Sequence, residues 1–296
     1  MTDAALPEIK SLWDYDNPAL SELRFRETLL DTAEQADLSY TLQLKTQLAR
    51  SLGLQNKFAE ADAVLDEVEA SLNDAPPVVF VRYQLERGRV RNSSGDKLAA
   101  RPLFQAALEK AEACGEDGYA LDAVHMLAIA HSGREALQWN LRGIALAEAS
   151  QNEQARNWLG PLYNNTGWTY HDDFQEYEKA LDLFERGVRF RTKRQQKKET
   201  QIAHWCVARA FRSLKRYDEA LAIQQRLLAE HAADGTDDGF VHEELAECLL
   251  ALGTSAEAPR HAALAHEQLS QLSWFAEESP HRLERLAGIA AGSITI

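Results

Sequence analysis

Glycine and proline are scarce in this sequence, which has 15 Gly and 8 Pro in 296 residues. Alternating apolar and polar runs of strand length are also hard to find, which argues against a β-sheet fold. No apolar run approaches the roughly 18 residues that a membrane-spanning helix needs. The first ten residues, MTDAALPEIK, contain no apolar signal core. We therefore expect a helical, cytoplasmic protein with no membrane partner.

Cysteine and positive charge are limited as well. The three cysteines, Cys114, Cys206 and Cys248, are far apart and odd in number, which fits reduced thiols in a core. Asp and Glu number 46 against 32 Lys and Arg, so the net charge is −14. Such a field repels phosphate backbones, and we expect no nucleic-acid partner. One basic run, at 189–198, is interpreted as a solvated helix end.

Motifs of catalysis are missing too. The sequence has no Gly-rich phosphate loop, no G-x-S-x-G elbow, no Cys-x-x-Cys pair and no H-E-x-x-H. The segments His171-Asp172-Asp173 and His204-Trp205-Cys206 contain metal-ligand residue types, but at spacings that match no common site. We expect no enzymatic activity, no metal and no cofactor.

The sequence does contain a recurring phrase. An alanine is followed four residues later by a mostly large side chain, and seven residues later by a small or apolar one. The copies are Ala61-Leu65-Val68, Ala100-Phe104-Ala107, Ala180-Phe184-Gly187, Ala220-Gln224-Leu227 and Ala258-Ala262-Ala265. Spacings of four and seven place these residues on one helix face. The small alanine lets a second helix approach closely, which predicts helix pairs.

A sixth, weaker copy is placed at Ala136, after a short turn at 131–134. The anchor alanines, Ala61, Ala100, Ala136, Ala180, Ala220 and Ala258, then lie 39, 36, 44, 40 and 38 residues apart. Small and large residues recur about 14 positions before each anchor, where the partner helix of a pair is expected.

The best copy, Thr166-Gly167-Trp168-Thr169-Tyr170 followed by Tyr177, Ala180 and Phe184, resembles the tetratricopeptide-repeat (TPR) family. The resemblance covers residues 42–269. It implies an all-α, TPR-like right-handed α-α superhelix, a solenoid of about six antiparallel helix pairs. The repeat exceeds the usual length of about 34 residues. In this respect it is similar to the longer-repeat branch seen in bacterial peptide-pheromone receptors and kinesin light chains.

The ends of the chain carry helix-start signals. Asn17-Pro18 combines a capping residue with a proline at the first helical position, which predicts a leading helix over 18–33. Ser279-Pro280 predicts a C-terminal capping helix over 279–290. No long linker separates the repeats, so we expect one solenoid over 1–296.

The resemblance implies binding of a protein or peptide segment, since the first helix of each pair lines the concave surface of such arrays. Asn164 and Asn165 are costly within a helix, and either a bound peptide backbone or a hydrogen bond between helices of the solenoid would offset the cost. The predicted groove residues are Arg82, Arg89, His125, Asn164, Asn165, Trp168, His171, Trp205, Arg209, Arg212, Glu243 and Glu247.

Other interpretations remain open at this point. The tryptophans can instead be core residues, and the arginines and glutamates can be solvated helix faces. A homodimeric scaffold would use surfaces near Trp274 and Phe275. A small-ligand sensor would have its pocket around Trp168, His171 and Trp205.

Overall fold

The computed structural model describes residues 6–253 and 256–294. Residues 1–5, on which the signal-core prediction partly rests, lie outside this range. No β-strand occurs in the described ranges. The helices are α1 (Pro18–Asp31), α2 (Leu38–Leu54), α3 (Phe58–Glu69), α4 (Pro77–Ser93), α5 (Lys97–Cys114), α6 (Asp117–Ala130), α7 (Gly133–Ala149), α8 (Glu153–Arg156), α9 (Leu159–Trp168), α10 (Tyr177–Lys193), α11 (Lys197–Ser213), α12 (Tyr217–Ala233), α13 (Gly239–Ala251), α14 (Ala258–Leu269), α15 (Ser273–Glu278) and α16 (Pro280–Ala290).

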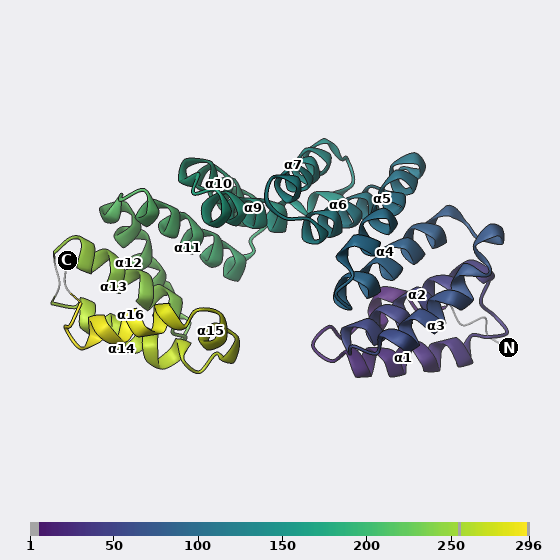
Figure 1. Cartoon of the computed structure of the whole chain (residues 1–296), viewed down its shortest axis with the longest axis horizontal. Helices are drawn as coiled ribbons and strands as arrows, with labels where there is room; N and C mark the ends of the chain where they lie inside the picture. Colours follow the sequence, from purple (N-terminus) through teal and green to yellow (C-terminus); the bar gives the residue numbers. More distant parts are fainter. Residues whose placement is uncertain (1–5, 254–255, 295–296) are drawn as a thin grey trace. The chain divides into compact units, whose positions relative to one another are not determined.

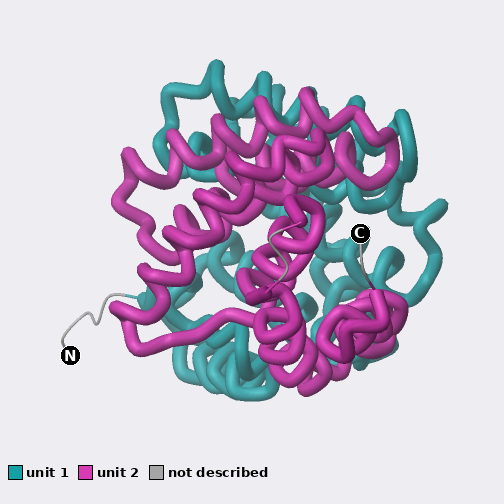
Figure 2. Tube along the Cα trace, turned by 90° about the vertical axis from the view of Figure 1, so that its left-hand side faces the viewer, with its two compact units in different colours: residues 1–158 teal, residues 159–296 magenta. Residues whose placement is uncertain are grey.

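The chain divides into two compact units, residues 1–158 and 159–296, each described by itself (Figure 2). In unit 1, α2 packs on α3, α4 on α5 and α6 on α7. In unit 2, α9 packs on α10, α11 on α12 and α13 on α14 (Figure 1). The prediction of an all-α fold built from adjacent helix pairs is confirmed. That the units form one continuous solenoid stays a prediction.

Close helix contact depends on small residues, as the repeated phrase indicates. A Cβ atom added to Gly88 of α4 would come within 2.4 Å of the Phe104 ring of α5. In unit 2, Gly167 of α9 has the same relation to Phe184 of α10, again at 2.4 Å. Both rings are almost fully buried. Each glycine therefore makes room for the phenyl ring of its partner helix.

The sixth anchor was misplaced by one helical turn. Ala61, Ala100, Ala180, Ala220 and Ala258 are fully buried, whereas Ala136 is only partly buried. In α7 the buried residues with the spacing of the repeated phrase are Asn140, Ile144 and Ala147, so Asn140 takes the anchor position. With Asn140 as the anchor, successive anchors lie 39, 40, 40, 40 and 38 residues apart. The error arose because α6 ends early and α7 begins a turn early, so distance from the turn was a poor guide.

One repeat contains an extra residue within its helix pair. Twelve positions separate Gly88 from Ala100, but thirteen separate Gly167 from Ala180. The extra residue is accommodated in a π-helical segment, Thr169–Asp173, which follows α9 directly. This wider turn carries His171, and the helix pair is thus preserved despite the insertion.

The ends agree with the sequence signals to within a few residues. The Asn17 side chain accepts a hydrogen bond from the Leu20 N–H at 3.1 Å, and α1 ends at Asp31 rather than at residue 33. The C-terminal helix α16 begins at Pro280 as expected. The short helix α15 before it was not predicted.

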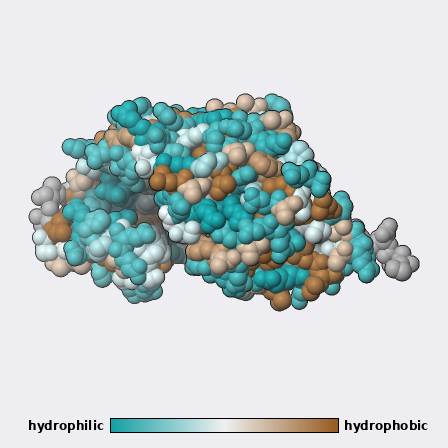
Figure 3. Space-filling model, turned by 45° about the vertical axis from the view of Figure 1, so that its right-hand side comes forward, coloured by the Kyte–Doolittle hydropathy of each residue, from teal (hydrophilic) through white to brown (hydrophobic). Residues whose placement is uncertain are grey.

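Apolar residues on the surface are interspersed with hydrophilic ones over the face shown in Figure 3. Scattered exposure of this kind is normal in proteins of this size.

Candidate ligand-binding site

The most distinctive hollow lies in unit 2 and has a volume of about 530 Å³. We call it the aromatic pocket. Its wall is formed by Trp168, Lys198, Gln201, Ile202, Trp205, Leu227, His231, Asp238, Phe240, Val241, Trp274 and Arg282. These residues come from several different helices, and the volume falls in the range of pockets that hold small ligands or buried side chains of a partner.

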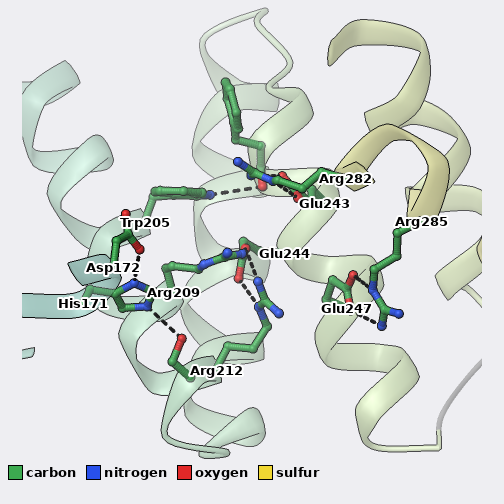
Figure 4. A network of polar contacts seen from close by, with 12 residues as sticks. His171, Asp172, Trp205, Arg209, Arg212, Glu243, Glu244, Glu247, Arg282 and Arg285 are labelled. Carbon is green, nitrogen blue, oxygen red and sulfur yellow. Dashed lines mark hydrogen bonds and ion pairs between the residues drawn. The ribbon is translucent and has the colours of Figure 1, made fainter. Parts of the chain in front are cut away.

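Four aromatic rings follow one another along this pocket. Ring centroids are 5.9 Å apart for Trp168 and Trp205, 5.9 Å for Trp205 and Phe240, and 6.3 Å for Phe240 and Trp274. The Trp205 indole donates a hydrogen bond from Nε1 to the Phe240 carbonyl at 3.1 Å, which joins α11 to α13 (Figure 4). Trp274 is 52% exposed. Trp205 is therefore held in place at the inner part of this row of rings, whereas the Trp274 ring at its outer end is open to a partner.

A second, smaller hollow of about 240 Å³ lies between α9, α10 and α11. We call it the amide pocket, and its wall is formed by Gly160, Pro161, Asn164, Asn165, Phe184, Gly187, Arg191, Glu199, Ile202 and Ala203. Ile202, which is 51% exposed, belongs to the walls of both pockets. The two pockets are therefore neighbours on the surface of unit 2.

Both explanations offered for the two asparagines find support here. Asn164 accepts a weak bond from the Cys206 thiol at 3.5 Å and donates to the Asn165 amide oxygen at 3.3 Å. Of these two contacts, only the one with Cys206 joins two helices, α11 and α9, as the structural interpretation requires. The same side chains also line the amide pocket, and Asn165 is exposed. A role in holding a peptide backbone stays a prediction.

The predicted charged residues of unit 2 are engaged in ion pairs between helices (Figure 4). Arg209 and Arg212 of α11 both contact the fully buried Glu244 of α13, at 2.5 and 2.7 Å. Burial alone would lower the pKa of Arg212, but Glu244 outweighs it and the pKa is raised. These arginines would have to leave a buried carboxylate to grip a ligand directly.

The two predicted glutamates have arginine partners as well. Glu243 forms a bidentate pair with Arg282 of α16, at 2.7 and 2.5 Å, and Glu247 pairs with Arg285 at 2.5 and 2.8 Å. Burial raises the pKa of Glu243 even though Arg282 opposes the shift. Both pairs tie the last helix to α13, so they stabilise the wall of the aromatic pocket.

His171 lies in neither pocket wall. From the π-helical segment its Nδ1 contacts Asp172 Oδ1 at 2.6 Å, and its Nε2 contacts Ser213 Oγ at 2.8 Å. The order Asp-His-Ser resembles a hydrolase triad in connectivity. However, Ser213 is the last residue of α11, where the free backbone groups are carbonyls rather than the N–H donors that an oxyanion needs. We interpret the contact as a link between the ends of two helices.

Three predicted residues belong to unit 1. Arg89 lies between Glu86 at 2.7 Å and Asp122 at 2.5 Å, and these carboxylates raise its pKa although burial opposes the shift. Arg82 donates to the Gln43 amide oxygen at 2.7 Å. Burial lowers the pKa of His125, whose ring lies 5.4 Å from that of Trp158. The predicted set is thus divided between two units.

Several pocket residues escaped prediction, among them Phe240, Arg191 and Arg282. None of them belongs to the repeated phrase that guided the sequence interpretation. Trp274 was singled out only as an assembly surface together with Phe275, which is fully buried and cannot contact a partner without unfolding. Assembly into a homodimer stays a prediction.

Within residues 6–253 and 256–294, no helix combines the length and apolar character needed to span a bilayer. In the same ranges, no group of three or more His, Cys, Asp or Glu side chains is arranged to hold a metal ion.

No protein-family model matches the sequence, and no curated protein matches it. Several solved structures, however, are similar to this chain. The chain is similar to a signal-transduction ATPase with a tetratricopeptide-repeat sensor from Pyrococcus horikoshii, with TM-score 0.71, 14% identity, and coverage of 94% of this chain but 45% of the other. It is also similar to the apo form of RapI, with TM-score 0.70, 13% identity, and coverage of 96% of this chain and 83% of the other. For NprR in complex with its cognate peptide NprX, the TM-score is 0.50 and the identity 14%, with coverage of 96% of this chain and 80% of the other.

These identities are low, so the likeness concerns the fold. The similar structures are repeat proteins of the kind that the sequence resembles. The chain spans less than half the length of the Pyrococcus ATPase.

Proposed function

We propose that this chain, whose fold is that of tetratricopeptide-repeat proteins, binds a peptide or protein segment through the aromatic and amide pockets of unit 2 and has no catalytic role. The observation that carries the proposal is the aromatic pocket itself, with four aromatic residues from α9, α11, α13 and α15 in its wall. Binding hot spots are enriched in such residues, which offer a large contact area with little loss of conformational entropy.

Each pocket suits a different part of an extended segment. The aromatic pocket suits a large apolar side chain, since Trp168, Trp205 and Phe240 surround a hollow rather than fill it. The amide pocket suits a peptide backbone, because an Asn side chain both donates and accepts hydrogen bonds. NprR, one of the similar structures, was solved with a peptide bound, which supports a peptide ligand.

The proposal changes the roles of the predicted residues. Trp168, Trp205, Asn164 and Asn165 would contact the ligand. The ion-paired residues, namely Arg209, Arg212, Glu243 and Glu247, would hold α11, α13 and α16 in the positions that form the pocket wall.

A selection from a phage-displayed library of random linear peptides tests the proposal. The wild type is compared with Trp274→Ala, which removes the exposed ring of the pocket, and with Tyr15→Ala, which removes an exposed ring in unit 1. We expect peptides that bind the wild type and Tyr15→Ala but not Trp274→Ala. Peptides that bind all three proteins equally would place binding elsewhere, and failure to select any peptide would contradict peptide binding.

A small apolar ligand is a second candidate, favoured by the 530 Å³ volume of the aromatic pocket. Such a ligand would quench Trp205 and Trp168 fluorescence and raise the melting temperature of the wild type but not of Trp274→Ala. A panel of uncharged aromatic and aliphatic compounds without any such effect would argue against this candidate.

A further inference from the structure

Arg191 differs from the other arginines of unit 2 that lie near the proposed ligand. Arg209, Arg212, Arg282 and Arg285 each contact a carboxylate. The Arg191 guanidinium donates from Nη1 to the neutral amide oxygen of Gln196 at 2.7 Å. Within the described part of the chain, no carboxylate lies within ion-pair distance of it. Arg191 is partly buried and lies in the wall of the amide pocket.

This arrangement is costly for the cation. Burial lowers the pKa of Arg191, and the more distant negative charge of Glu199 opposes the shift only in part. A buried or half-buried charge is normally paired, because otherwise the lost hydration is not replaced. Arg191 already contacts the Gln196 amide and the Phe190 ring, both of which are uncharged. An anion in the amide pocket would add a charged partner through charge-assisted hydrogen bonds.

Gly160 leaves the space that the Arg191 guanidinium occupies. A Cβ atom at Gly160 would lie 2.3 Å from Cζ and 2.4 Å from Nη2 of Arg191. The guanidinium therefore rests directly on the α9 backbone, beside Pro161 and Asn164 of the same pocket. Any larger residue at position 160 would push it away from the pocket wall.

We propose that Arg191 determines specificity by pairing with an acidic side chain of the bound segment, close to the large apolar side chain that enters the aromatic pocket. This inference rests on the proposed function. The two side chains would be near neighbours along the segment, because Ile202 belongs to both pocket walls. The net charge of −14 repels acidic peptides in general, so the preference arises from local contact with Arg191.

Glu199 limits this preference, since this residue lines the same pocket and its negative charge acts on Arg191. Replacing it with glutamine removes a negative charge near the bound acid. We therefore expect Glu199→Gln to bind acidic peptides more tightly than the wild type does.

The test is a sequenced phage selection of random linear peptides on four proteins. Arg191→Gln removes the charge, and Gly160→Ala keeps the charge but displaces it. Arg189→Gln is the matched control, since it removes an exposed arginine of the same helix that lies outside both pockets. We expect Asp and Glu to be enriched near a large apolar residue on the wild type and Arg189→Gln, and not on the other two.

A selected peptide is then synthesised with its acidic residue and with the matching amide, Asn or Gln. The acidic form should bind the wild type about tenfold more tightly than the amide form, and Arg191→Gln should bind both forms equally. Apolar peptides without acidic enrichment, or enrichment that persists in Arg191→Gln, would overturn the inference and leave the proposed function standing. If no peptide is selected, the proposed function fails and the inference with it.

Discussion

Arg212 and Glu244 form a bidentate ion pair between α11 and α13, with Nε 2.7 Å from Oε2 and Nη2 3.0 Å from Oε1. The carboxylate has no exposed surface, and Arg209 contacts it as well. One buried glutamate is therefore shared by two arginines that were predicted to lie in a ligand groove.

This pair predicts a large loss of stability when Glu244 is changed. Glu244→Gln keeps the shape but leaves two guanidinium groups without their carboxylate, so unfolding free energy should fall by about 3 kcal/mol. Chemical denaturation measures the change. Glu219→Gln is the control, since its pair with Arg216 is exposed and its loss should change little. Equal effects of both substitutions would show that burial does not matter here.

Gly167 should be intolerant of even one methyl group. In Gly167→Ala the new Cβ meets the buried Phe184 ring, and we expect a loss of about 2 kcal/mol. Gly187→Ala in the facing helix has its nearest neighbour at 3.8 Å, so the better helix propensity of alanine should leave it neutral or more stable. The melting temperatures of the two variants and of the wild type are compared. A Gly167→Ala variant as stable as the wild type would contradict the close packing of Gly167 against Phe184.

Acid should weaken unit 1 through Glu22. Burial would raise the pKa of this carboxyl group, but hydrogen bonds from Lys57, Arg26 and Gln55 lower it from 4.5 to about 2. The contribution of Glu22 to stability is therefore fully present above pH 4.5 and is lost as the pH falls toward 2. Glu22→Gln should be less stable than the wild type near neutral pH, and this difference should disappear at the acid end. A difference independent of pH would contradict the ion-pair explanation.

Thiol reactivity should separate the three cysteines. Burial raises the pKa of Cys206 and that of Cys248 to about 12, whereas Cys114 is exposed. Near neutral pH a maleimide reagent should label Cys114 first, and the other two only after unfolding. Mass spectrometry of the labelled peptides identifies the order. Rapid labelling of Cys206 in the folded protein would show that the contact between α9 and α11 opens readily.

The helix pairs could be predicted because their signals are local. Ala61, Leu65 and Val68 lie within two turns of one helix, and their spacing alone indicates a common face. The same reasoning failed at Ala136, where the helix begins a turn early and Asn140 takes the buried position. A buried asparagine does not resemble the anchor alanines, so the regular spacing of the repeats was hidden.

The candidate site could be predicted only in part. Trp168 and Trp205 were identified because they stand beside repeat residues, but Phe240 and Trp274 join them from helices far along the chain. Likewise, nothing near Arg209 in the sequence indicates Glu244, its partner 35 positions away.

The sequence by itself determined the all-α fold and its helix pairs, since helix periodicity and small contact residues act over one or two helices. Only the tertiary structure decided which charges are paired, which aromatic rings line a hollow, and that Arg191 in the amide pocket contacts a neutral amide rather than a carboxylate. Those properties depend on distances between helices, and local spacing does not set them.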